Sequence, residues 1–329
     1  MFRVVPAVAL LIAPLAWADA PFGPGQRSML CAHNCYPEHG QYHDRLARAL
    51  STGAPLSIEQ DVAWFVDPDT GEGRSIASHG APLSGDEPTL ADYFFEGVRP
   101  IIERALAEGN TGDWPLITLN IEFKDGSPEH RRGVWAVLQE YADWLCSAER
   151  VDDPSAVQPI TVRPILALTQ GGDSVFHDEV PVGGRLLVFG SARTRSVPMP
   201  EGLSRREQAD WSATVDPRDI LVDPATNYRR WWNNSWRAIE SRPGRGGVAV
   251  NDAIRARLEA FADHAHAMGY WLRLYSVNGY DSSPNLGWSP LYNTGSLEAA
   301  QARWQAARDA AVDFIATDQY EDAAAALRK

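Results

Sequence analysis

The chain has 329 residues and a mass of 36.2 kDa, enough for one large domain or two small ones with a sizeable buried core. Its composition, 44% hydrophobic and 22% charged, excludes a disordered or fibrous protein. The formal net charge of −13 argues against a general nucleic-acid binder, so we expect no nucleic-acid partner. No internal apolar run is long enough to span a bilayer, so we expect at most peripheral membrane contact.

The first twenty residues predict a cleaved secretory signal peptide, residues 1–20. Arg3 gives a short basic start, residues 4–15 are apolar, and small-x-small cleavage patterns end at Ala18 and Ala20. An uncleaved anchor is the alternative. We therefore expect a secreted or periplasmic protein.

Short β-type runs then alternate with helical patterns along the chain. Strands are expected at residues 28–32, 56–65, 74–79, 116–123, 161–168, 185–189, 271–277 and 314–316. Helices are expected before residue 51 and at residues 89–109, 128–146, 251–268 and 297–311. The run at 74–79 is interpreted as an excursion between turns. Residues 210–245 are the least regular part and are expected to form a long loop over the site.

This alternation is typical of a parallel sheet covered by helices. Eight expected strands favour a closed α/β TIM (β/α)₈ barrel, a single domain over residues 21–329, over an open doubly wound sheet. No G-x-G-x-x-G motif follows the first strand and no Walker A motif is present, so a nucleotide-binding sheet lacks its usual sequence support.

Polar residues follow the expected strands at their C-terminal ends, where barrel enzymes place catalytic groups. His33 and Asn34 come after the first strand, and His79 ends the excursion. Glu59 and Asp61 lie two positions apart near the end of the second strand, so both point to the same side.

The next main strand carries Asn120, Glu122 and Lys124 at the same spacing, hence on one face. Lys124 is the only internal lysine of the chain. Asn278 and Asp318 follow the last two main strands. Each feature alone is common in loops and on surfaces, but their order at successive strand ends is the order that a barrel active site requires.

Three inward carboxylates, Glu59, Asp61 and Glu122, predict an oxygen-rich site for a hard divalent cation, Mg²⁺ or Ca²⁺. Without a positive partner these groups would repel one another and raise their own pKa values. Two histidines beside such a site are suited to general acid and general base catalysis near neutral pH.

These blocks resemble the superfamily of glycerophosphodiester phosphodiesterases and phosphatidylinositol-specific phospholipases C, which are TIM-barrel phosphodiesterases. Residues 54–62 (APLSIEQDV) are similar to the family pattern Gly-Ala-x-x-x-Ile-Glu-x-Asp-Val, and residues 120–124 (NIEFK) to Ile-Glu-x-Lys. Residues 275–278 (YSVN) and 313–318 (DFIATD) are similar to the closing strands of the family. The His-Asn start and the Ser-His-Gly block look closest to the fungal altered-inheritance-of-mitochondria branch.

The resemblance implies a role for each matching position. His33 and His79 would form the acid–base pair, and Lys124 would contact the substrate phosphate. The cation would be held by Glu59, Asp61 and Glu122, and Asn34 and Asn278 would be further substrate contacts.

A second candidate substrate contact lies in the segment RRWW, residues 229–232. Arginines interleaved with tryptophans are suited to a phosphate and an apolar or sugar-bearing headgroup, which nominates Arg229 and Trp232. The alternative is a loop that its aromatic residues pack onto the barrel.

The sequence therefore predicts a secreted, metal-dependent phosphoric diester hydrolase of lipid metabolism that cleaves a small phosphodiester or a phospholipid headgroup. Water or a neighbouring hydroxyl of the substrate remain open as the nucleophile. Two other classes stay open as well. A glycoside hydrolase on a TIM barrel would use paired carboxylates but gives no reason for His33, His79 and Lys124. A catalytically silent ligand-binding barrel would not need all five catalytic and metal positions.

Overall fold

The computed structural model describes residues 22–328, except 39, 110–113, 243–247, 280–285 and 287–292. The expected signal peptide lies outside the described residues. Within the described part of the chain, no helix is both long and apolar enough to cross a membrane.

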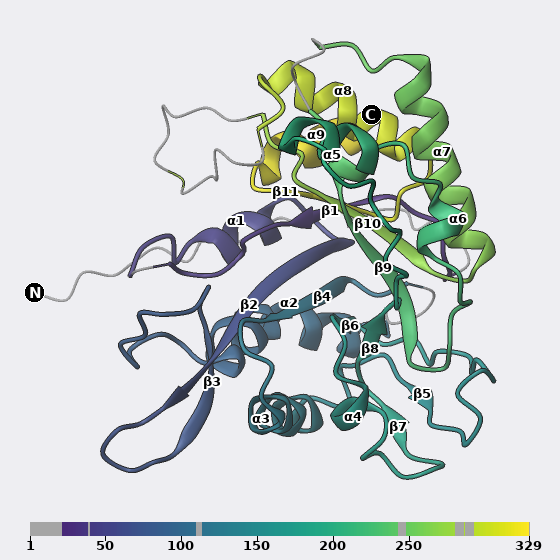
Figure 1. Ribbon diagram of the computed structural model, residues 1–329. Coiled ribbons are helices and arrows are strands. Elements are labelled where there is room, and N and C mark those ends of the chain that lie inside the picture. The colour runs from purple at the N-terminus through teal and green to yellow at the C-terminus, as the bar shows by residue number, and fades with distance from the viewer. Residues whose placement is uncertain are drawn as a thin grey trace, which may run out of the picture.

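Eight of the described strands form a closed parallel barrel (Figure 1). The order of strands around it is β1 (Met29–Ala32), β2 (Leu56–Val66), β4 (Ile117–Phe123), β6 (Ile165–Thr169), β8 (Phe189–Ser191), β9 (Arg229–Ser235), β10 (Trp271–Tyr275) and β11 (Phe314–Thr317). The barrel closes because β1 pairs in parallel with both β11 and β2. The predicted TIM barrel is confirmed.

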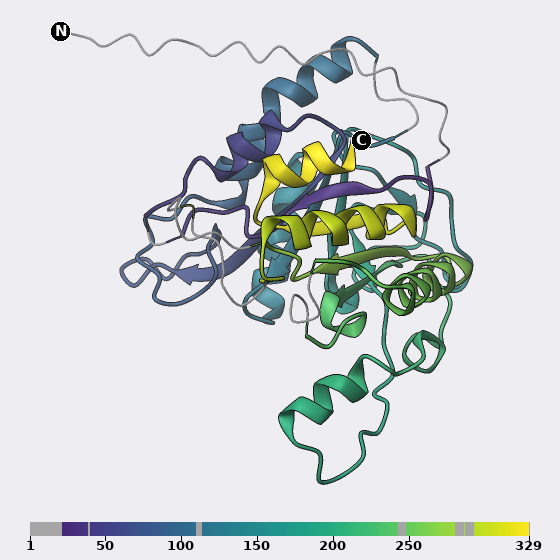
Figure 2. The same cartoon turned by 90° about the horizontal axis from the view of Figure 1, so that it is seen from above.

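Helices cover the outside of the barrel. They include α1 (Arg45–Ser51), α2 (Glu96–Ala107), α3 (Pro128–Glu140), α7 (Asp252–Ala267), α8 (Leu297–Asp309) and α9 (Tyr320–Leu327), and a π-helical segment (Ala91–Phe95) leads into α2. The connections contain α4 (Asp173–Phe176), α5 (Arg205–Ser212), α6 (Pro217–Ile220) and a 3₁₀ turn (Trp236–Ala238). Figure 2 shows α5 standing out from the body of the barrel, and none of its residues is buried.

Two pairings between strands of the described part of the chain lie outside the barrel. β3 (Gly73–Ala77) runs antiparallel to the end of β2 and forms the expected excursion. β5 (Ala148–Glu149) pairs with β7 (Arg185–Leu186) in a separate two-stranded sheet. The strand expected at residues 185–189 is therefore divided, because its first part forms β7 and the barrel strand β8 begins only at Phe189.

Two other expected boundaries shift. The strand expected from residue 161 begins at Ile165, since Pro164 has no N–H to offer a ladder and supplies only its carbonyl to β4. The helix expected over 128–146 ends at Glu140, where Tyr141 leaves the helical conformation.

The expectation of a long loop over residues 210–245 is wrong, because β9 inside it is a barrel strand. Its sequence, RRWWNNS, does not show the alternation of polar and apolar residues that is typical of a strand. Trp231 belongs to the cluster inside the barrel, whereas Trp232 packs in the cluster between strands and helices, so two adjacent tryptophans serve opposite faces.

The same alternation separates the two faces of the other strands. On β2, Leu56, Ile58 and Val62 belong to the outer core, which leaves Glu59 and Asp61 facing the interior. One part of the interior is filled by apolar side chains, as expected for a packed barrel. These are Met29, Cys31, Leu166, Leu168, Phe189, Trp231, Trp271, Phe314 and Ala316.

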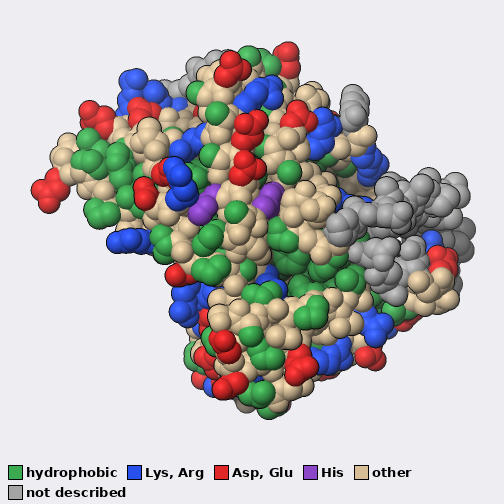
Figure 3. Space-filling model, turned by 90° about the vertical axis from the view of Figure 1, so that its right-hand side faces the viewer, with side chains coloured by type: hydrophobic (Ala, Val, Ile, Leu, Met, Phe, Trp, Pro, Cys, Tyr) green, Lys and Arg blue, Asp and Glu red, His purple; other side chains and the backbone are tan. Residues whose placement is uncertain are grey.

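Polar residues come later along the same strands and therefore occupy the C-terminal end of the interior. His33 follows Cys31 and Ala32, Arg273 follows Trp271 at a spacing of two, and Asp318 follows β11. β1 and β2 run toward the left of Figure 1, so this end of the barrel lies on that side. Figure 3 views the molecule from the opposite side, where acidic, basic and apolar side chains are interspersed.

Candidate active site

Three carboxylates from two neighbouring strands meet at this end of the barrel. β2 and β4 pair in parallel, and their register places Asp61 beside Glu122 and Glu59 beside Asn120. Oxygens of Glu59, Asp61 and Glu122 lie within 4.8 Å of one another. We call these three residues the acidic cluster. Its predicted convergence is confirmed, because a spacing of two within each strand and in-register pairing between the strands bring the residues to one place.

Two basic side chains reach the acidic cluster. The Lys124 Nζ atom lies 2.9 Å from Asp61 Oδ2 and 2.6 Å from Glu122 Oε1. The Lys124 amide donates to the Val62 carbonyl, which extends the pairing of β4 with β2 and holds the lysine there. Arg273, on β10, forms an ion pair with Glu59. Burial and then the carboxylates of the cluster raise the pKa of Glu122.

His33 is buried and is held by a carboxylate. Its Nδ1 lies 2.7 Å from Asp318 Oδ1, while its Nε2 lies 3.7 Å from Glu59 Oε1. The backbone carbonyl of His33 also accepts from the Tyr320 hydroxyl at 2.8 Å. Burial alone would lower the pKa of His33, but the charges of Glu59 and Asp318 outweigh it and raise that pKa.

His79 has the same kind of partner but a different exposure. Its Nδ1 lies 2.7 Å from Asp61 Oδ2, and 62% of its side chain is exposed. The hydrogen bond to Asp61 raises the pKa of His79. The Tyr36 hydroxyl donates to Asn34 Oδ1 at 2.9 Å and lies 3.1 Å from His79 Nδ1, so it links the surroundings of both histidines. We call His33–Asp318 and His79–Asp61 the two histidine–carboxylate dyads.

Asn278 and Asn34 contribute to these dyads. The Asn278 amide donates to Asp318 Oδ2 at 2.8 Å, and its carbonyl oxygen accepts from the amide N of Asp318 at 2.9 Å and the Thr317 hydroxyl at 2.7 Å. Asn278 is buried, so this geometry supports a positioning role rather than the expected contact with substrate. Asn34 donates to Asp318 Oδ1 at 2.9 Å through its side chain and to Glu59 through its backbone N–H.

Arg229 and Trp232 do not join the acidic cluster. Arg229 donates to Asp173 and to the Ser191 carbonyl. Trp232 is 1% exposed, and its ring stacks on Phe261 of α7 with the ring centroids 5.2 Å apart. The expectation that Trp232 contacts substrate is not supported, because its ring is buried between the barrel and α7 and is not accessible to a substrate.

Sequence reasoning missed Arg273, Asn233 and Tyr36. Arg273 donates to Asn233 Oδ1 at 2.9 Å besides pairing with Glu59. A signal for Arg273 was present, because it shares the inward parity of Trp271 and Tyr275 within an otherwise apolar strand. Nothing in the loop sequence around Tyr36 indicates that its hydroxyl reaches His79.

The acidic cluster fits a divalent cation. Asp61 Oδ1 and, on the neighbouring strand, Asn120 Oδ1 are buried and have no hydrogen-bond partner among the described residues. A buried acceptor without a donor is costly, and coordination to a cation would satisfy it. Carboxylate and amide oxygens are also the ligand types that Mg²⁺ and Ca²⁺ prefer.

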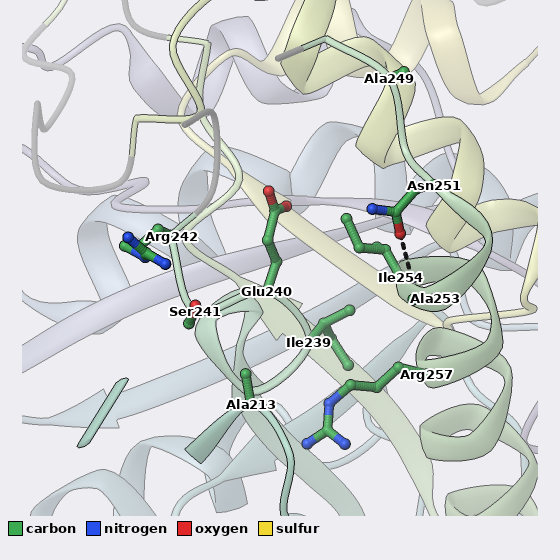
Figure 4. Close-up of a pocket in the computed structure, with 10 residues that line it drawn as sticks. All are labelled: Ala213, Ile239, Glu240, Ser241, Arg242, Ala249, Asn251, Ala253, Ile254 and Arg257. Atoms are coloured by element: carbon green, nitrogen blue, oxygen red, sulfur yellow. Dashed lines mark hydrogen bonds between the residues drawn. The ribbon is translucent and has the colours of Figure 1, made fainter. Parts of the chain in front are cut away.

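A separate cavity of about 450 Å³ lies between the end of α5, the 3₁₀ turn and the start of α7 (Figure 4). None of the predicted site residues lines it. Its charged groups have partners within the protein: Glu240 binds Arg303 at 2.8 Å, and Arg257 donates to the Val215 carbonyl at 2.8 Å. The cavity is therefore distinct from the candidate active site.

Several solved structures are similar to this chain. Phosphatidylinositol-specific phospholipase C from Listeria monocytogenes is 11% identical over 95% of this chain and 96% of that chain, with a TM-score of 0.49. The calcium-dependent phosphoinositol-specific phospholipase C from a Pseudomonas species is 13% identical over 95% and 94%, with a TM-score of 0.47. A glycerophosphoryl diester phosphodiesterase from Parabacteroides distasonis is 14% identical over 95% and 88%, with a TM-score of 0.40.

No family model and no curated protein matches the chain. At such identities, likeness to solved structures does not assign a reaction, so the chemistry has to be argued from the site itself.

Proposed function

We propose that the chain is a phosphoric diester hydrolase whose acid–base pair is His33 and His79. The observation that carries the proposal is the pair of histidine–carboxylate dyads beside the acidic cluster. In both dyads Nδ1 faces a carboxylate, which leaves Nε2 as the nitrogen for proton transfer. Such a carboxylate orients the ring and stabilises the imidazolium that forms during the reaction.

The reaction requires one proton acceptor and one proton donor. One Nε2 takes the proton of the attacking hydroxyl, from water or from the substrate itself, and the other Nε2 gives a proton to the leaving oxygen. Glu59, Asp61 and Glu122 would hold a divalent cation, which when bound stabilises negative charge on the phosphoryl oxygens. Lys124 would add a second positive charge beside the phosphate.

The substrate would be a glycerophosphodiester or a phospholipid headgroup. The protein would be exported and would contact membranes at most peripherally. The resemblance of residues 54–62 and 120–124 to the phosphodiesterase superfamily supports this class. Mg²⁺ and Ca²⁺ both satisfy the oxygen ligands of the acidic cluster.

A substrate panel tests the proposal. Purified protein would be incubated with bis-p-nitrophenyl phosphate, glycerophosphodiesters, phospholipids and p-nitrophenyl glycosides, with and without EDTA, and products would be identified by phosphorus NMR. We expect release of a phosphomonoester or a cyclic phosphate, at a rate that His33→Ala and His79→Ala each lower by about 10²-fold or more. Glycoside cleavage that survives both substitutions would instead establish the glycoside hydrolase.

His177→Ala is the matched control for these variants. His177 also presents Nδ1 to a carboxylate, Asp178, at 2.8 Å, but neither residue contacts the acidic cluster. Its replacement should leave turnover unchanged. If no member of the panel is cleaved by the wild-type protein, the proposal fails and a silent ligand-binding barrel becomes the better description.

A further inference from the structure

Arg273 is an unusual residue for the interior of a barrel. It lies on β10 with only 2% of its surface exposed. Its guanidinium crosses the interior to Glu59, a residue 214 positions away on a strand that is not a neighbour of β10. The same group donates to Asn233 Oδ1 at 2.9 Å and lies 3.3 Å from Cys31 Sγ.

The two carboxylate oxygens of Glu59 therefore have different partners. Oε2 is bound by Arg273 and also accepts from Asn120 Nδ2 at 3.4 Å. Oε1 accepts from the Asn34 backbone N–H at 3.3 Å and faces His33 Nε2. Arginine stays protonated at all relevant pH values. Glu59 is the carboxylate that Arg273 contacts among the described residues. A buried charge without its partner is strongly destabilising, so the two residues depend on each other.

We propose that Arg273 is a built-in positive partner of the acidic cluster, which orients Glu59 and weakens the binding of a divalent cation to the cluster. A fixed positive charge next to Glu59 repels a second cation and occupies one of the oxygens that could bind it. The inference rests on the proposed function only in treating the acidic cluster as a cation site. Arg273 would thus set the affinity of the acidic cluster for a divalent cation.

The experiment measures cation affinity and stability without using activity. Wild-type protein, Arg273→Met and the double variant Glu59→Gln/Arg273→Met would be titrated with Mg²⁺ and with Ca²⁺ by calorimetry, and melted in EDTA and in each cation. We expect Arg273→Met to melt at a lower temperature in EDTA, to bind cation about tenfold or more tightly, and to regain stability when cation is added.

The double variant separates charge from packing. Because it removes both members of the pair, it should melt above Arg273→Met in EDTA and should not show the tighter binding. A double variant as unstable as Arg273→Met would mean that the arginine acts by packing alone, which would overturn the inference. Unchanged, weaker or undetectable cation binding by a folded Arg273→Met would overturn it too.

Arg303→Met is the matched control. Arg303 is also fully buried and also pairs with one glutamate, Glu240, through two contacts of 2.8 and 2.9 Å. It should lose stability equally in EDTA and in cation, with cation affinity unchanged. If Arg273→Met behaves as predicted while no phosphodiester is cleaved, the proposed function alone fails. If cleavage occurs while Arg273→Met binds cation like the wild type, this inference alone fails.

Discussion

His33 and His79 differ in burial but share an arrangement in which Nδ1 faces a carboxylate. Asp318, the partner of His33, is itself held by Asn278 through two hydrogen bonds in opposite directions. Asp61, the partner of His79, also binds Lys124. Each histidine is therefore positioned by a carboxylate that is positioned in turn, an arrangement suited to the proton transfer proposed above.

The first prediction concerns the histidines. His33→Ala and His79→Ala should each lower kcat by about 10²–10⁴-fold, because each removes one partner of the proton transfer. Circular dichroism should show an intact fold in both. Steady-state kinetics on the best substrate of the panel is the measurement, and near-normal turnover in either variant would remove that residue from the mechanism.

The second prediction concerns Asp318. Asp318→Asn keeps the size of the side chain but cannot accept from both His33 and Asn278 as the carboxylate does. We expect kcat to fall by about 10²-fold or more with KM little changed, since the orientation of the ring is lost rather than substrate binding. A kcat equal to that of the wild type would show that Asp318 serves only the fold.

Among the elements, the hairpin of β2 and β3 is fixed to α3 by a chain of polar contacts. The Ser75 hydroxyl lies 2.9 Å from His130 Nε2, and His130 Nδ1 lies 2.7 Å from Asp125 Oδ2. The same Asp125 oxygen accepts from the Trp64 backbone N–H at 3.0 Å. Because β3 leads directly to His79, this chain of contacts also holds one side of the candidate active site.

The third prediction concerns His130, which is fully buried. His130→Ala should lower the free energy of unfolding by about 2–4 kcal/mol, because it leaves a cavity and buried polar groups without partners. Chemical denaturation is the measurement. Glu129→Ala is the control, since this neighbour is exposed and should change stability by no more than about 0.5 kcal/mol.

The effect of His130→Ala should also depend on pH. Burial lowers the pKa of His130, so the folded protein takes up this proton at a lower pH than the unfolded chain, which takes it up near pH 6.5. The contribution of His130 to stability is therefore complete above about pH 6.5 and declines as the pH falls below that value. The difference in the free energy of unfolding between wild type and variant should shrink on acidification. A difference that grows instead would contradict this pH dependence.

At the scale of the whole molecule, closing the barrel concentrates charge at one end. The acidic cluster and Asp318 meet Lys124 and Arg273 there, although they come from strands far apart in the chain. Carboxylates exceed fixed positive charges in this region, and the buried Asp61 Oδ1 has no donor among the described residues. A bound cation would reduce the repulsion between the carboxylates and would also satisfy the buried Asp61 oxygen.

The fourth prediction is that Mg²⁺ or Ca²⁺ raises the melting temperature, because the folded state binds the cation and the unfolded chain has no preformed site. Glu122→Gln should abolish this rise with little loss of stability in EDTA, since Glu122 is only half-buried and its described polar contact is Lys124. Thermal melts with and without cation are the measurement. A rise that persists in Glu122→Gln would place the cation elsewhere.

The fifth prediction concerns export. Protein recovered from the natural host should begin just after Ala18 or Ala20, where the small-x-small patterns end. N-terminal sequencing is the measurement, and a mature chain that begins at Met1 would contradict the signal peptide.

Patterns within single strands were enough to predict the acidic cluster. The side-chain period of a strand is two, so Glu59 with Asp61, and Asn120 with Glu122, had to share faces wherever those strands lie. Alternation of strands and helices also indicated the barrel, although one of the eight strands counted was the excursion β3 and the barrel strand β9 was missed. These inferences succeed because they depend on neighbours in sequence.

Only the tertiary structure decided the partners of the inward side chains. Arg273 and Glu59 are 214 positions apart, and they meet because barrel closure sets which strands face each other across the interior. Trp232 could not be assigned to solvent or core from its own segment, because β9 presents aromatic residues to both faces and α7 covers one of them. The sequence by itself thus determined which polar residues share a strand face, whereas the closed barrel determined which charges neutralise one another, since electrostatic pairing depends on distances in space rather than along the chain.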